Sequence, residues 1–356
     1  MTDVKGRAVL RYDGDLEPSA VVAMPPDGRW PMAVMNPTGD ALVSCPLLPA
    51  SAGHVGWWHG RVGLSAYRED LGRGIGVGII DTGVGPHPAL DHVESVGAFI
   101  DGTVDTAGGQ DAQMHGSHIC GIIGGRPTRA RDFGGIAPGV SLTSARIFPP
   151  RGTATQLGIA HAMDELSGRR GADLINLSLG SDEGSEIAHD AIKHALERGT
   201  LCICAAGNTA GDIMYPGAFP ETVAVTALGI VGWGPPGSVP AMRAPQDRSR
   251  FGVDDLFLDI FSCHGPGVVA SAPGVGIVST VPERPGLKSP YVAMGGTSMA
   301  AAVVCATLAV LLSRSGEYKS LPRTRARAEM ARTILGRSCR SAGLDASLQG
   351  LGVPGV

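Results

Sequence analysis

The stretch Ile75-Gly76-Val77-Gly78-Ile79-Ile80-Asp81-Thr82-Gly83 predicts a short apolar strand that ends in a carboxylate and a turn. From about residue 74 to residue 306, similar apolar runs alternate with amphipathic stretches. This pattern is typical of an α/β fold with a mostly parallel sheet and covering helices. The sequence predicts strands at 75–80, 142–147, 173–177, 200–205 and 222–227, and helices at 116–124, 155–168, 184–198 and 298–314.

Three strings in this region carry groups that belong together chemically. Asp81 ends the first strand, His115 begins the string His115-Gly116-Ser117-His118, and Ser298 lies in Gly295-Gly296-Thr297-Ser298-Met299-Ala300. A serine hydroxyl is a weak nucleophile at neutral pH, so acyl transfer needs an imidazole to take its proton and a carboxylate to hold that imidazole. Ser298 is also expected at the start of a helix, where free N–H groups stabilise developing negative charge.

Composition argues against two classes of partner. A formal net charge of -4 gives no electrostatic reason to expect nucleic acid or an anionic membrane. The longest apolar stretch, about 299–312, is too short to span a bilayer and is expected to be a buried helix. The N-terminus lacks the apolar segment of a secretory signal, and the seven cysteines form no paired framework. We therefore expect a cytoplasmic protein, or a secreted one if the chain is a processed form.

Two segments interrupt the alternating pattern. Residues 1–56 contain turn signals between short β-like runs at Arg7–Tyr12, Ala20–Met24, Met32–Met35 and Ala41–Cys45. We expect either a β-rich extension or a removable pro-segment there. Residues 229–260 are rich in proline and glycine and then in mixed charge, which predicts a surface insertion close to the substrate cleft. An arginine-rich helix with a solvated basic face is expected at 322–336.

The strings resemble those of the subtilisin-like serine peptidases over about residues 56–312. Residues 79–84 are similar to the family's aspartate motif and residues 115–121 to its histidine motif. Further landmarks follow in the family's order, at 135–140, 173–180, 205–208, 215–217 and 296–300. The resemblance implies a subtilisin-like α/β peptidase domain over 57–356, with helices on both faces of the sheet and the insertion at about 229–260.

The resemblance also implies roles for individual residues. Ser298 would be the nucleophile, His115 the general base and then acid, and Asp81 the carboxylate that orients His115. Asn208 would donate its side-chain amide to an oxyanion hole, beside the backbone N–H of Ser298. The substrate-binding residues would be Ser178, Leu179, Gly180, Ala205, Ala206, Gly207 and Met214.

The resemblance implies that Ser178-Leu179-Gly180 is a strand edge that pairs with an extended main chain, so a peptide or protein substrate is expected. Met214 is expected to narrow the specificity pocket, and Asp212, if it faced inward, would favour a basic residue. No cofactor or metal is expected. A structural calcium is conceivable in this family, but Arg126-Pro127-Thr128-Arg129-Ala130-Arg131 stands where calcium ligands are usual, and arginine cannot ligate calcium.

Several structural or alternative interpretations compete with these assignments. Asp81, His115 and His118 could instead hold zinc, but that leaves the serine string unexplained, and His118 is expected to be structural. Residues 72–78 have glycines at every second position and miss the dinucleotide spacing. The serine string lacks the final glycine of an esterase nucleophile elbow. Cys202 and Cys204 are expected on one face of a strand, as buried thiols.

The leading hypothesis is a serine endopeptidase that acts through an acyl-enzyme. An alternative keeps this chemistry but dedicates it to one precursor peptide, by leader removal or by transfer to an amine in transpeptidation or cyclisation. A pseudoprotease that binds peptides without cutting them is a third hypothesis, which the presence of all four catalytic residue types disfavours. The sequence leaves the natural substrate and the oligomeric state open.

Overall fold

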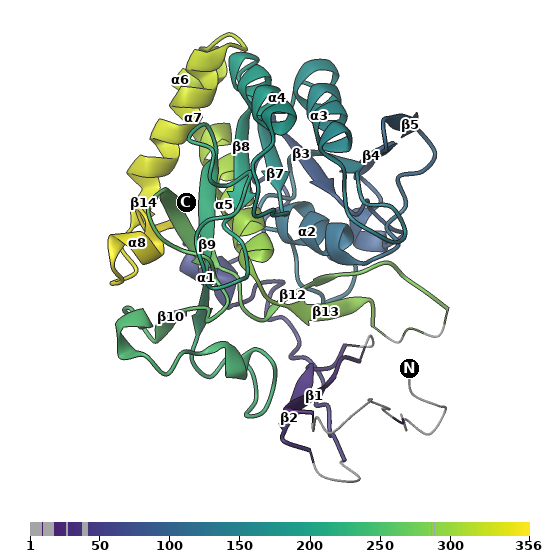
Figure 1. Cartoon of the computed structure of the whole chain (residues 1–356), viewed down its shortest axis with the longest axis vertical. Helices are drawn as coiled ribbons and strands as arrows, with labels where there is room; N and C mark the ends of the chain where they lie inside the picture. The colour runs from purple at the N-terminus through teal and green to yellow at the C-terminus, as the bar shows by residue number, and fades with distance from the viewer. Residues whose placement is uncertain (1–8, 10–17, 26–27, 38–41, 286, 288) are drawn as a thin grey trace.

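The centre of the computed structural model is a nine-stranded sheet (Figure 1). The structure describes the whole chain except residues 1–8, 10–17, 26–27, 38–41, 286 and 288. Strand order is β10-β9-β8-β7-β3-β6-β4-β5, and β11 also pairs with β9. The strands are β3 (Gly76–Asp81), β4 (Glu94–Ile100), β5 (Thr103–Asp105), β6 (Ser141–Arg146), β7 (Leu174–Leu177), β8 (Leu201–Ala205), β9 (Val223–Ile230), β10 (Leu256–Leu258) and β11 (Val268–Pro273).

Most of this sheet is parallel. The pairs β4–β6, β6–β3, β3–β7, β7–β8, β8–β9 and β9–β11 run parallel, whereas β5 and β10 are antiparallel to their neighbours. A strand buried on both faces of a parallel sheet needs apolar side chains in both directions, and β3 meets this need with an almost continuous apolar run. The predicted fold class is confirmed.

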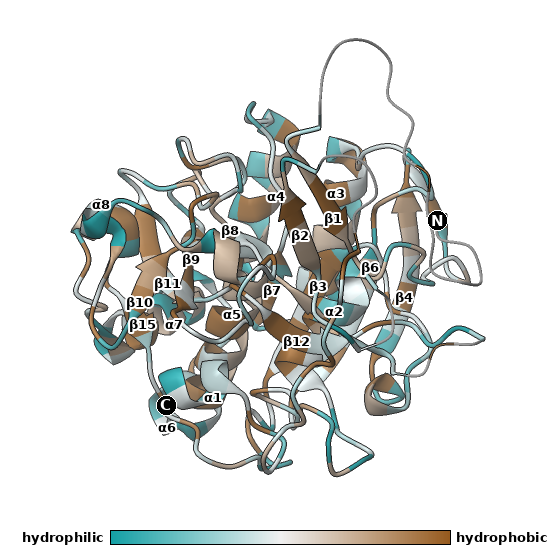
Figure 2. Cartoon of the chain, turned by 90° about the horizontal axis from the view of Figure 1, so that it is seen from below, coloured by the Kyte–Doolittle hydropathy of each residue, from teal (hydrophilic) through white to brown (hydrophobic). Residues whose placement is uncertain are grey.

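Helices cover both faces of the sheet. α2 (His115–Gly124) and α5 (Thr297–Arg314) contribute to one hydrophobic cluster, which includes Val77 and Ile79 of β3. α3 (Gln156–Asp164), its π-helical extension η2 (Glu165–Arg169) and α4 (Glu186–Glu197) contribute to a second cluster with Ile80. Figure 2 shows brown, hydrophobic strands inside the molecule and teal, hydrophilic residues mainly on outer helices and loops.

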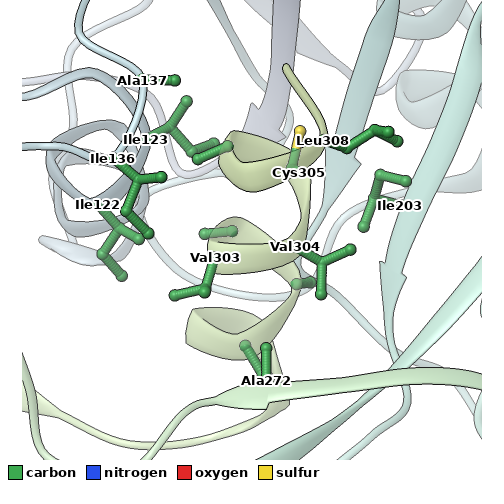
Figure 3. Close-up of a cluster of buried hydrophobic side chains, with 14 of the residues drawn as sticks. Ile122, Ile123, Ile136, Ala137, Ile203, Ala272, Val303, Val304, Cys305 and Leu308 are labelled. Carbon is green, nitrogen blue, oxygen red and sulfur yellow. The ribbon is translucent and has the colours of Figure 1, made fainter. Parts of the chain in front are cut away.

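α5 is the central core helix. It is long and apolar enough to cross a bilayer, but 83% of it is buried inside the protein, so the expectation of a buried helix is confirmed. In Figure 3, its Val303 lies toward Ile122 of α2, while Val304 and Leu308 lie toward Ile203 of β8. A helix that is apolar on nearly every side must be surrounded by other elements.

Hydroxyl side chains set the first residues of α3 and α4. Thr155 Oγ1 accepts the N–H of Gly158 at 3.2 Å, and Ser185 Oγ accepts the N–H of Ala188 at 3.4 Å. Such N-caps satisfy donors that lack partners within the helix. Both helices therefore begin one or two residues after the predicted positions.

The strand predictions at the N-terminus are only partly confirmed. β1 (Ala20–Ala23) and β2 (Met32–Met35) form an antiparallel hairpin. The run predicted at Arg7–Tyr12 lies outside the described residues except for Val9. The run at Ala41–Cys45 is wrong over its described part, 42–45, which contains no strand; Cys45 instead accepts a hydrogen bond from the Arg29 guanidinium through its carbonyl oxygen.

The N-terminal segment and the predicted insertion contact each other. Ala33 N–H donates to Gly237 O at 3.0 Å, and Val239 N–H donates to Pro31 O at 2.8 Å. Trp30 is buried, and its ring lies edge-on to Trp233, with centroids 5.8 Å apart. Within the range predicted as an insertion, 229–260, the ends belong to β9 and β10 of the main sheet, and the stretch around Gly237 lies beside the β1–β2 hairpin in the lower region of Figure 1.

The remaining elements lie outside the main sheet. Below the main sheet, β12 (Ile277–Thr280) and β13 (Tyr291–Met294) form a hairpin that leads into α5. The others are α1 (Trp57–Arg61), η1 (Pro88–Leu90), η3 (Ala241–Arg243), η4 (Arg248–Arg250), α6 (Gly316–Ser320), α7 (Arg325–Ser338), β14 (Cys339–Arg340), α8 (Ala346–Gln349) and β15 (Val353–Pro354).

The sequence predicts that the basic face of α7 is solvated, and this prediction is wrong for two of its arginines. Arg327 Nη2 lies 2.9 Å from Asp173 Oδ1, and Arg332 Nη2 donates to the carbonyls of Glu221 and Thr222 at 2.6 and 3.0 Å. These arginines hold the C-terminal helix to the ends of the sheet. Periodicity alone cannot reveal such contacts, because the acceptors lie more than 100 residues away.

Candidate active site

The predicted site residues gather at the carboxyl edge of the parallel sheet. Asp81 ends β3, Ser178 follows β7, and Asn208 lies three residues beyond β8. α2 begins with His115, and Ser298 is the second residue of α5. In a parallel sheet the carboxyl ends of the strands meet at one edge, where ligands of α/β proteins usually bind.

Asp81 and His115 form a hydrogen-bonded pair. Asp81 Oδ1 lies 2.7 Å from His115 Nδ1 and accepts the N–H of Thr82 at 2.7 Å, while Asp81 Oδ2 lies 3.0 Å from His115 Nδ1. The Asp81 side chain is 1% exposed and that of His115 is 31% exposed. Since Nδ1 donates to the carboxylate, Nε2 is left as the proton acceptor on the open side of the ring.

This environment raises the pKa of His115 above its usual value. Burial opposes the charged form and lowers the pKa, but the negative charge of Asp81, the hydrogen bond from His115 to Asp81 and the more distant charge of Asp111 outweigh it. An imidazole that gains a proton readily and remains oriented by a carboxylate is suited to general base catalysis.

The first turn of α2 is held against the end of β3. A Cβ on Gly116 would lie 2.2 Å from the carbonyl oxygen of Gly83, so only glycine permits this approach. The buried carboxylate of Asp111 accepts both the N–H and the hydroxyl of Ser117, at 2.8 and 2.6 Å, and also the hydroxyl of Thr82 at 2.9 Å. Asp111 thus links the two segments that carry Asp81 and His115.

Ser298 lies in the first turn of α5 and is 8% exposed. Its Oγ lies 3.3 Å from the carbonyl oxygen of Ser178, and Ser178 Oγ donates to the carbonyl oxygen of Ser298 at 3.0 Å. The hydroxyl of Ser298 therefore hydrogen-bonds to Ser178 rather than to His115. In enzymes without substrate, catalytic hydrogen bonds are often long and tighten only when substrate binds.

Asn208 is fixed so that its amide nitrogen is free. Asn208 Oδ1 accepts the N–H and the hydroxyl of Thr297, at 2.9 and 3.2 Å. A Cβ on Gly296, whose φ is +153°, would lie 3.0 Å from Asn208 Oδ1, which favours glycine at that position. Among the described residues, neither Asn208 Nδ2 nor Ser298 N–H has a hydrogen-bond acceptor. The two residues that carry these unpaired donors line the same pocket.

A pocket of about 220 Å³ opens next to Ser298. It is lined by Ser178, Leu179, Gly180, Ala205, Gly207, Asn208, Thr209, Met214, Thr297 and Ser298. Six of the seven predicted substrate-binding residues are in this set. Ala206 is not; it is fully buried, and its carbonyl oxygen accepts the N–H of Met214 at 2.8 Å.

Thr209 and Thr297 line the pocket but are not predicted from the sequence. Their positions directly after Asn208 and directly before Ser298 are the signal that would have suggested them.

One wall of the pocket has backbone groups without partners. Within the described residues, Leu179 and Gly180 make no backbone hydrogen bond, so this edge is free to pair with an extended chain.

Met214, which is expected to narrow the pocket, lines it and packs against two of its glycines. A Cβ on Gly180 would lie 3.2 Å from Met214 Sδ, and one on Gly207 would lie 2.6 Å from Met214 Cγ, so the methionine packs across both glycines. Asp212 is exposed and does not line the pocket. The sequence-based option that Asp212 selects a basic residue therefore has no support in this geometry.

His118 has a structural position. It is fully buried, and its Nε2 lies 3.1 and 3.2 Å from the carbonyl oxygens of Ile277 and Val292, so Nε2 carries a hydrogen and bridges β12 and β13. Burial, together with the nearby His115, lowers the pKa of His118 to about 3. A neutral imidazole tied to the hairpin cannot share the role of His115.

The segment at 126–131 does not fit a calcium ion. Arg126 donates through Nε and Nη2 to the carbonyl oxygen of Pro138, at 3.1 and 3.0 Å. Asp132, the residue that follows this segment, accepts the N–H groups of Thr128 and Arg129 through Oδ2 at 3.3 and 2.9 Å. Calcium needs six to eight oxygen ligands, whereas here the Arg126 guanidinium takes up a carbonyl oxygen next to the loop.

Comparisons with known proteins point to one family. The model of the subtilase family matches residues 72–352. Subtilisin Savinase of Lederbergia lenta is 30% identical over 270 residues, which cover 75% of this chain and 87% of that protein. M-protease of Shouchella clausii (strain KSM-K16) is 29% identical over 290 residues, which cover 81% of this chain and 67% of that protein.

Solved structures show the same architecture. A psychrophilic protease, S41, superimposes with a TM-score of 0.69 at 25% identity, and the match covers 86% of this chain and 99% of that one. Sphericase gives the same TM-score and the same coverage at 23% identity. The parts outside these matches make up a minority of the chain.

Proposed function

We propose that this chain, which belongs to the subtilase family and is a subtilisin-like serine endopeptidase, cleaves peptide bonds with Asp81, His115 and Ser298 as its catalytic triad and Asn208 in its oxyanion hole. The observation that carries this proposal most directly is that the Asn208 Nδ2 and Ser298 N–H donors are unpaired and belong to residues of one pocket. The hydrogen-bonded pair of Asp81 and His115 supports it from the other side of the site.

The chemistry follows from these positions. Ser298 Oγ attacks the peptide carbonyl carbon while its proton passes to His115 Nε2, and the carbonyl oxygen becomes an oxyanion. The C–N bond then breaks, and the leaving amine takes the proton from His115. Water, activated by the same imidazole, hydrolyses the acyl ester on Ser298. Asp81 stabilises the imidazolium and holds the tautomer in which Nδ1 donates.

The oxyanion hole supports the step in which negative charge develops. Thr297 holds Asn208 Oδ1 through two hydrogen bonds, which directs the amide N–H groups away from Thr297. The Ser298 N–H lies in the first turn of α5, where the helix dipole adds to the stabilisation. Removing one such side-chain donor costs about 10²–10³ in kcat, a value measured in subtilisin, a relative of this chain.

Protein substrates follow from the protease assignment, and the finer substrate recognition is part of our proposal. The free edge at Leu179 and Gly180 pairs with the substrate main chain, and the adjacent pocket receives one side chain. No Lys, Arg, Asp or Glu lines this pocket in the described residues, and the Met214 side chain packs against Gly180 and Gly207 in its wall. We infer a preference for a small or medium apolar residue before the scissile bond.

Active-site labelling tests the nucleophile. A fluorophosphonate probe should modify the wild-type protein and not the Ser298→Ala variant, both checked for folding by thermal melting. Asn208→Ala should keep the labelling site but lower kcat far more than it changes KM, because the donor acts on charge that is absent in the ground state. Absence of a Ser298-dependent adduct from folded protein would contradict the proposal.

A narrow pocket also favours a restricted set of substrates over general digestion. This supports the second hypothesis, a dedicated processing protease that removes a leader or transfers the acyl group to an amine. Mass spectrometry of products from a peptide library, with and without added amine nucleophiles, separates the two. A broad set of hydrolysed sites would point to a general protease, and amide products would point to transpeptidation.

We also propose that the protein resides in the cytoplasm. Six of its cysteines are free thiols in the structure, as expected in a reducing compartment: Cys120, Cys202, Cys204, Cys263, Cys305 and Cys339. Cys202 and Cys204 both lie in the cluster beneath α3 and α4, and burial raises the pKa of Cys202 to about 12. Fractionation of cells that express the native gene, followed by immunoblotting, tests the location.

A further inference from the structure

We propose that Arg243 and Asp259, an ion pair in the segment between β9 and β11, are positioning residues for the oxyanion hole. This proposal rests on the proposed function, since it takes Asn208 as an oxyanion donor. Residues 207–210 form the loop that carries Asn208, and we call them the oxyanion loop. The ion pair belongs to the part of the chain that the sequence predicts as an insertion, so the inference gives that segment a role in catalysis.

The ion pair itself is buried. Arg243 Nη1 lies 3.0 Å from Asp259 Oδ2 and 3.2 Å from Asp259 Oδ1. The Asp259 side chain is 0% exposed and that of Arg243 is 18% exposed. Burial raises the pKa of Asp259, while the charge of Arg243 opposes the rise. A carboxylate at such depth needs its partner, because an unpaired buried charge is strongly destabilising.

Arg243 also reaches the segment that leads to the nucleophile. Its Nη2 donates to the carbonyl oxygen of Gly295 at 3.2 Å. Gly295 is followed by Gly296, whose backbone packs directly against Asn208 Oδ1, and then by Thr297, which holds that oxygen. The guanidinium therefore anchors the backbone just before the two residues that set the positions of both oxyanion donors.

Asp259 connects the pair to the far end of the oxyanion loop. Its Oδ1 accepts the N–H of Phe261 at 3.2 Å, and the Arg243 guanidinium lies over the Phe261 ring, 4.5 Å from the centroid. The carbonyl oxygen of Phe261 accepts the N–H of Ala210 at 2.9 Å. The last residue of the loop is thus held by a segment that the ion pair holds in turn.

Cys263 extends the same support to both neighbours of Asn208. Its N–H donates to the carbonyl oxygen of Gly207 at 2.9 Å. Its Sγ accepts the N–H of Thr209 at 3.4 Å and lies 3.1 Å from the Thr209 hydroxyl. The segment 259–263 therefore contacts the oxyanion loop before and after Asn208, and Arg243 joins this segment to the backbone on the Ser298 side.

The geometry explains why a pair outside the pocket should affect the rate. An oxyanion donor works only when it lies at hydrogen-bond distance from the developing charge, and a misplacement of about 1 Å can cost 10²-fold. Loss of Arg243 releases Gly295 and leaves Asp259 without its charge partner. Asn208 and the Ser298 N–H then lose their fixed separation. Substrate binding along Leu179 and Gly180 does not use these contacts.

The test is a double-mutant cycle between Arg243→Gln and Asn208→Ala, measured with one peptide substrate. In the wild-type background, Arg243→Gln should lower kcat by about 10-fold or more with KM changed less than about twofold. In the Asn208→Ala background the same substitution should lower kcat by less than about threefold, because residues that act through one donor are not additive.

A control ion pair joins the same segment to α1. Arg61→Gln breaks the pair between Arg61 of α1 and the exposed Asp254 of the segment, whose Nη1 and Oδ2 atoms are 3.0 Å apart. This variant should leave kcat unchanged. If Arg243→Gln fails to fold, Arg243→Lys keeps the charge but lacks the planar fork that contacts Asp259 and Gly295 together. It should then show the same loss of kcat, dependent on Asn208.

The outcomes separate this inference from the proposed function. An unchanged kcat in a folded Arg243 variant would overturn the positioning role, as would an equal loss in both backgrounds or an equal loss in Arg61→Gln. If Asn208→Ala itself leaves kcat unchanged, the oxyanion assignment fails, and the positioning role fails with it. A large effect of Asn208→Ala with none from Arg243→Gln refutes only the inference made from the ion pair.

Discussion

At the scale of single residues, the site depends on groups whose chemistry is changed by their neighbours. His115 is a weak base in isolation, and the buried Asp81 makes it a stronger one by raising its pKa against the effect of burial. His118, three residues away, has its pKa lowered to about 3 by burial. Two histidines on one helix thus take opposite roles because one faces a carboxylate and the other faces carbonyl oxygens.

This contrast predicts the pH dependence of catalysis. His115 must be neutral to accept the proton of Ser298, so kcat/KM should fall as the pH drops through the raised pKa of His115. Asp81→Asn removes the charge that raises this pKa, and the acid limb should move to lower pH. The same substitution should lower kcat by about 10⁴, as for the equivalent change in a chymotrypsin-type triad.

The measurement is a kcat/KM profile between pH 5 and 9 for wild type and Asp81→Asn. Because His118 does not gain a proton in this range, the acid limb reports on His115. An acid limb that stays in place in a folded Asp81→Asn variant would refute the assignment of that limb to the pair.

Met214 should determine how large a side chain the pocket accepts. Met214→Gly removes the side chain that packs across Gly180 and Gly207. The ratio of kcat/KM for a peptide with phenylalanine before the scissile bond to that for one with alanine should rise about 10-fold or more, since each methylene of fit is worth about 1–3 kcal/mol. Met35→Ala, on the exposed face of β2, is the control and should leave the ratio unchanged. A constant ratio in Met214→Gly would place the specificity elsewhere.

At the scale of secondary-structure elements, sequence patterns predict the central strands and helices most accurately. The strand predicted at 200–205 is found at Leu201–Ala205, because a strand buried on both faces leaves a continuous apolar run. The pattern does not predict β4, since its first residues, Glu94 and Ser95, are exposed. Nor does it predict the β12–β13 hairpin. That hairpin is tied in place by His118, from a helix 159 residues earlier, and no local pattern records such a contact.

The same distinction holds within the site. Asp81, His115, Asn208 and Ser298 could be predicted because each lies in a motif with its own short string. The supporting residues could not: Asp259 is paired with Arg243 across 16 residues, and Arg243 reaches Gly295 across 52. Their role depends on the fold of the segment between β9 and β11, which composition identifies only as irregular.

The packing of α5 predicts which substitutions the fold tolerates least. Leu308 is fully buried and lies toward Ile203 of the sheet (Figure 3). Leu308→Ala should lower the free energy of unfolding by about 2–5 kcal/mol, because it leaves a cavity in a closely packed core. Leu157→Ala on α3 is the matched control, since Leu157 is 43% exposed, and it should change the free energy of unfolding by about 0.5 kcal/mol or less. Urea titrations with equal midpoints for the two variants would contradict this account of the core.

At the scale of the whole molecule, the N-terminal segment packs against residues 231–255, between β9 and β10. Trp233 lies edge-on to both Trp30 and Trp58, with ring centroids 5.8 and 6.0 Å apart, and its Nε1 donates to the carbonyl oxygen of Gly276 at 2.7 Å. Trp30 and Trp58 are 4% and 1% exposed. The N-terminal segment therefore shares an aromatic core with the peptidase domain and with the segment that carries Arg243.

The end of the N-terminal segment is hydrogen-bonded to the peptidase domain. Ser51 Oγ donates to the carbonyl oxygen of Asp132 at 2.6 Å, and His54 Nδ1 lies 2.9 Å from the same oxygen. The carbonyl oxygen of His54 accepts the N–H of Gly134 at 2.9 Å. Removal of residues 28–56 would uncover Trp233, which packs against Trp30, and would leave the partners of Ser51 and His54 unpaired. The loss of one buried aromatic contact surface alone costs several kcal/mol.

We therefore expect the active enzyme to keep residues 28–56. Intact-mass measurement of purified, active protein should find an N-terminus at or before residue 28, in wild type and in Ser298→Ala alike. A removable pro-segment predicts the opposite, an N-terminus near residues 50–60 in wild type only, because self-cleavage needs Ser298. A variant that begins at residue 57 tests the energetic argument independently: it should melt at a lower temperature than the full chain, since it lacks Trp30 against Trp233. A fully active protein that begins near residue 57 with unchanged melting temperature would show that the segment is dispensable.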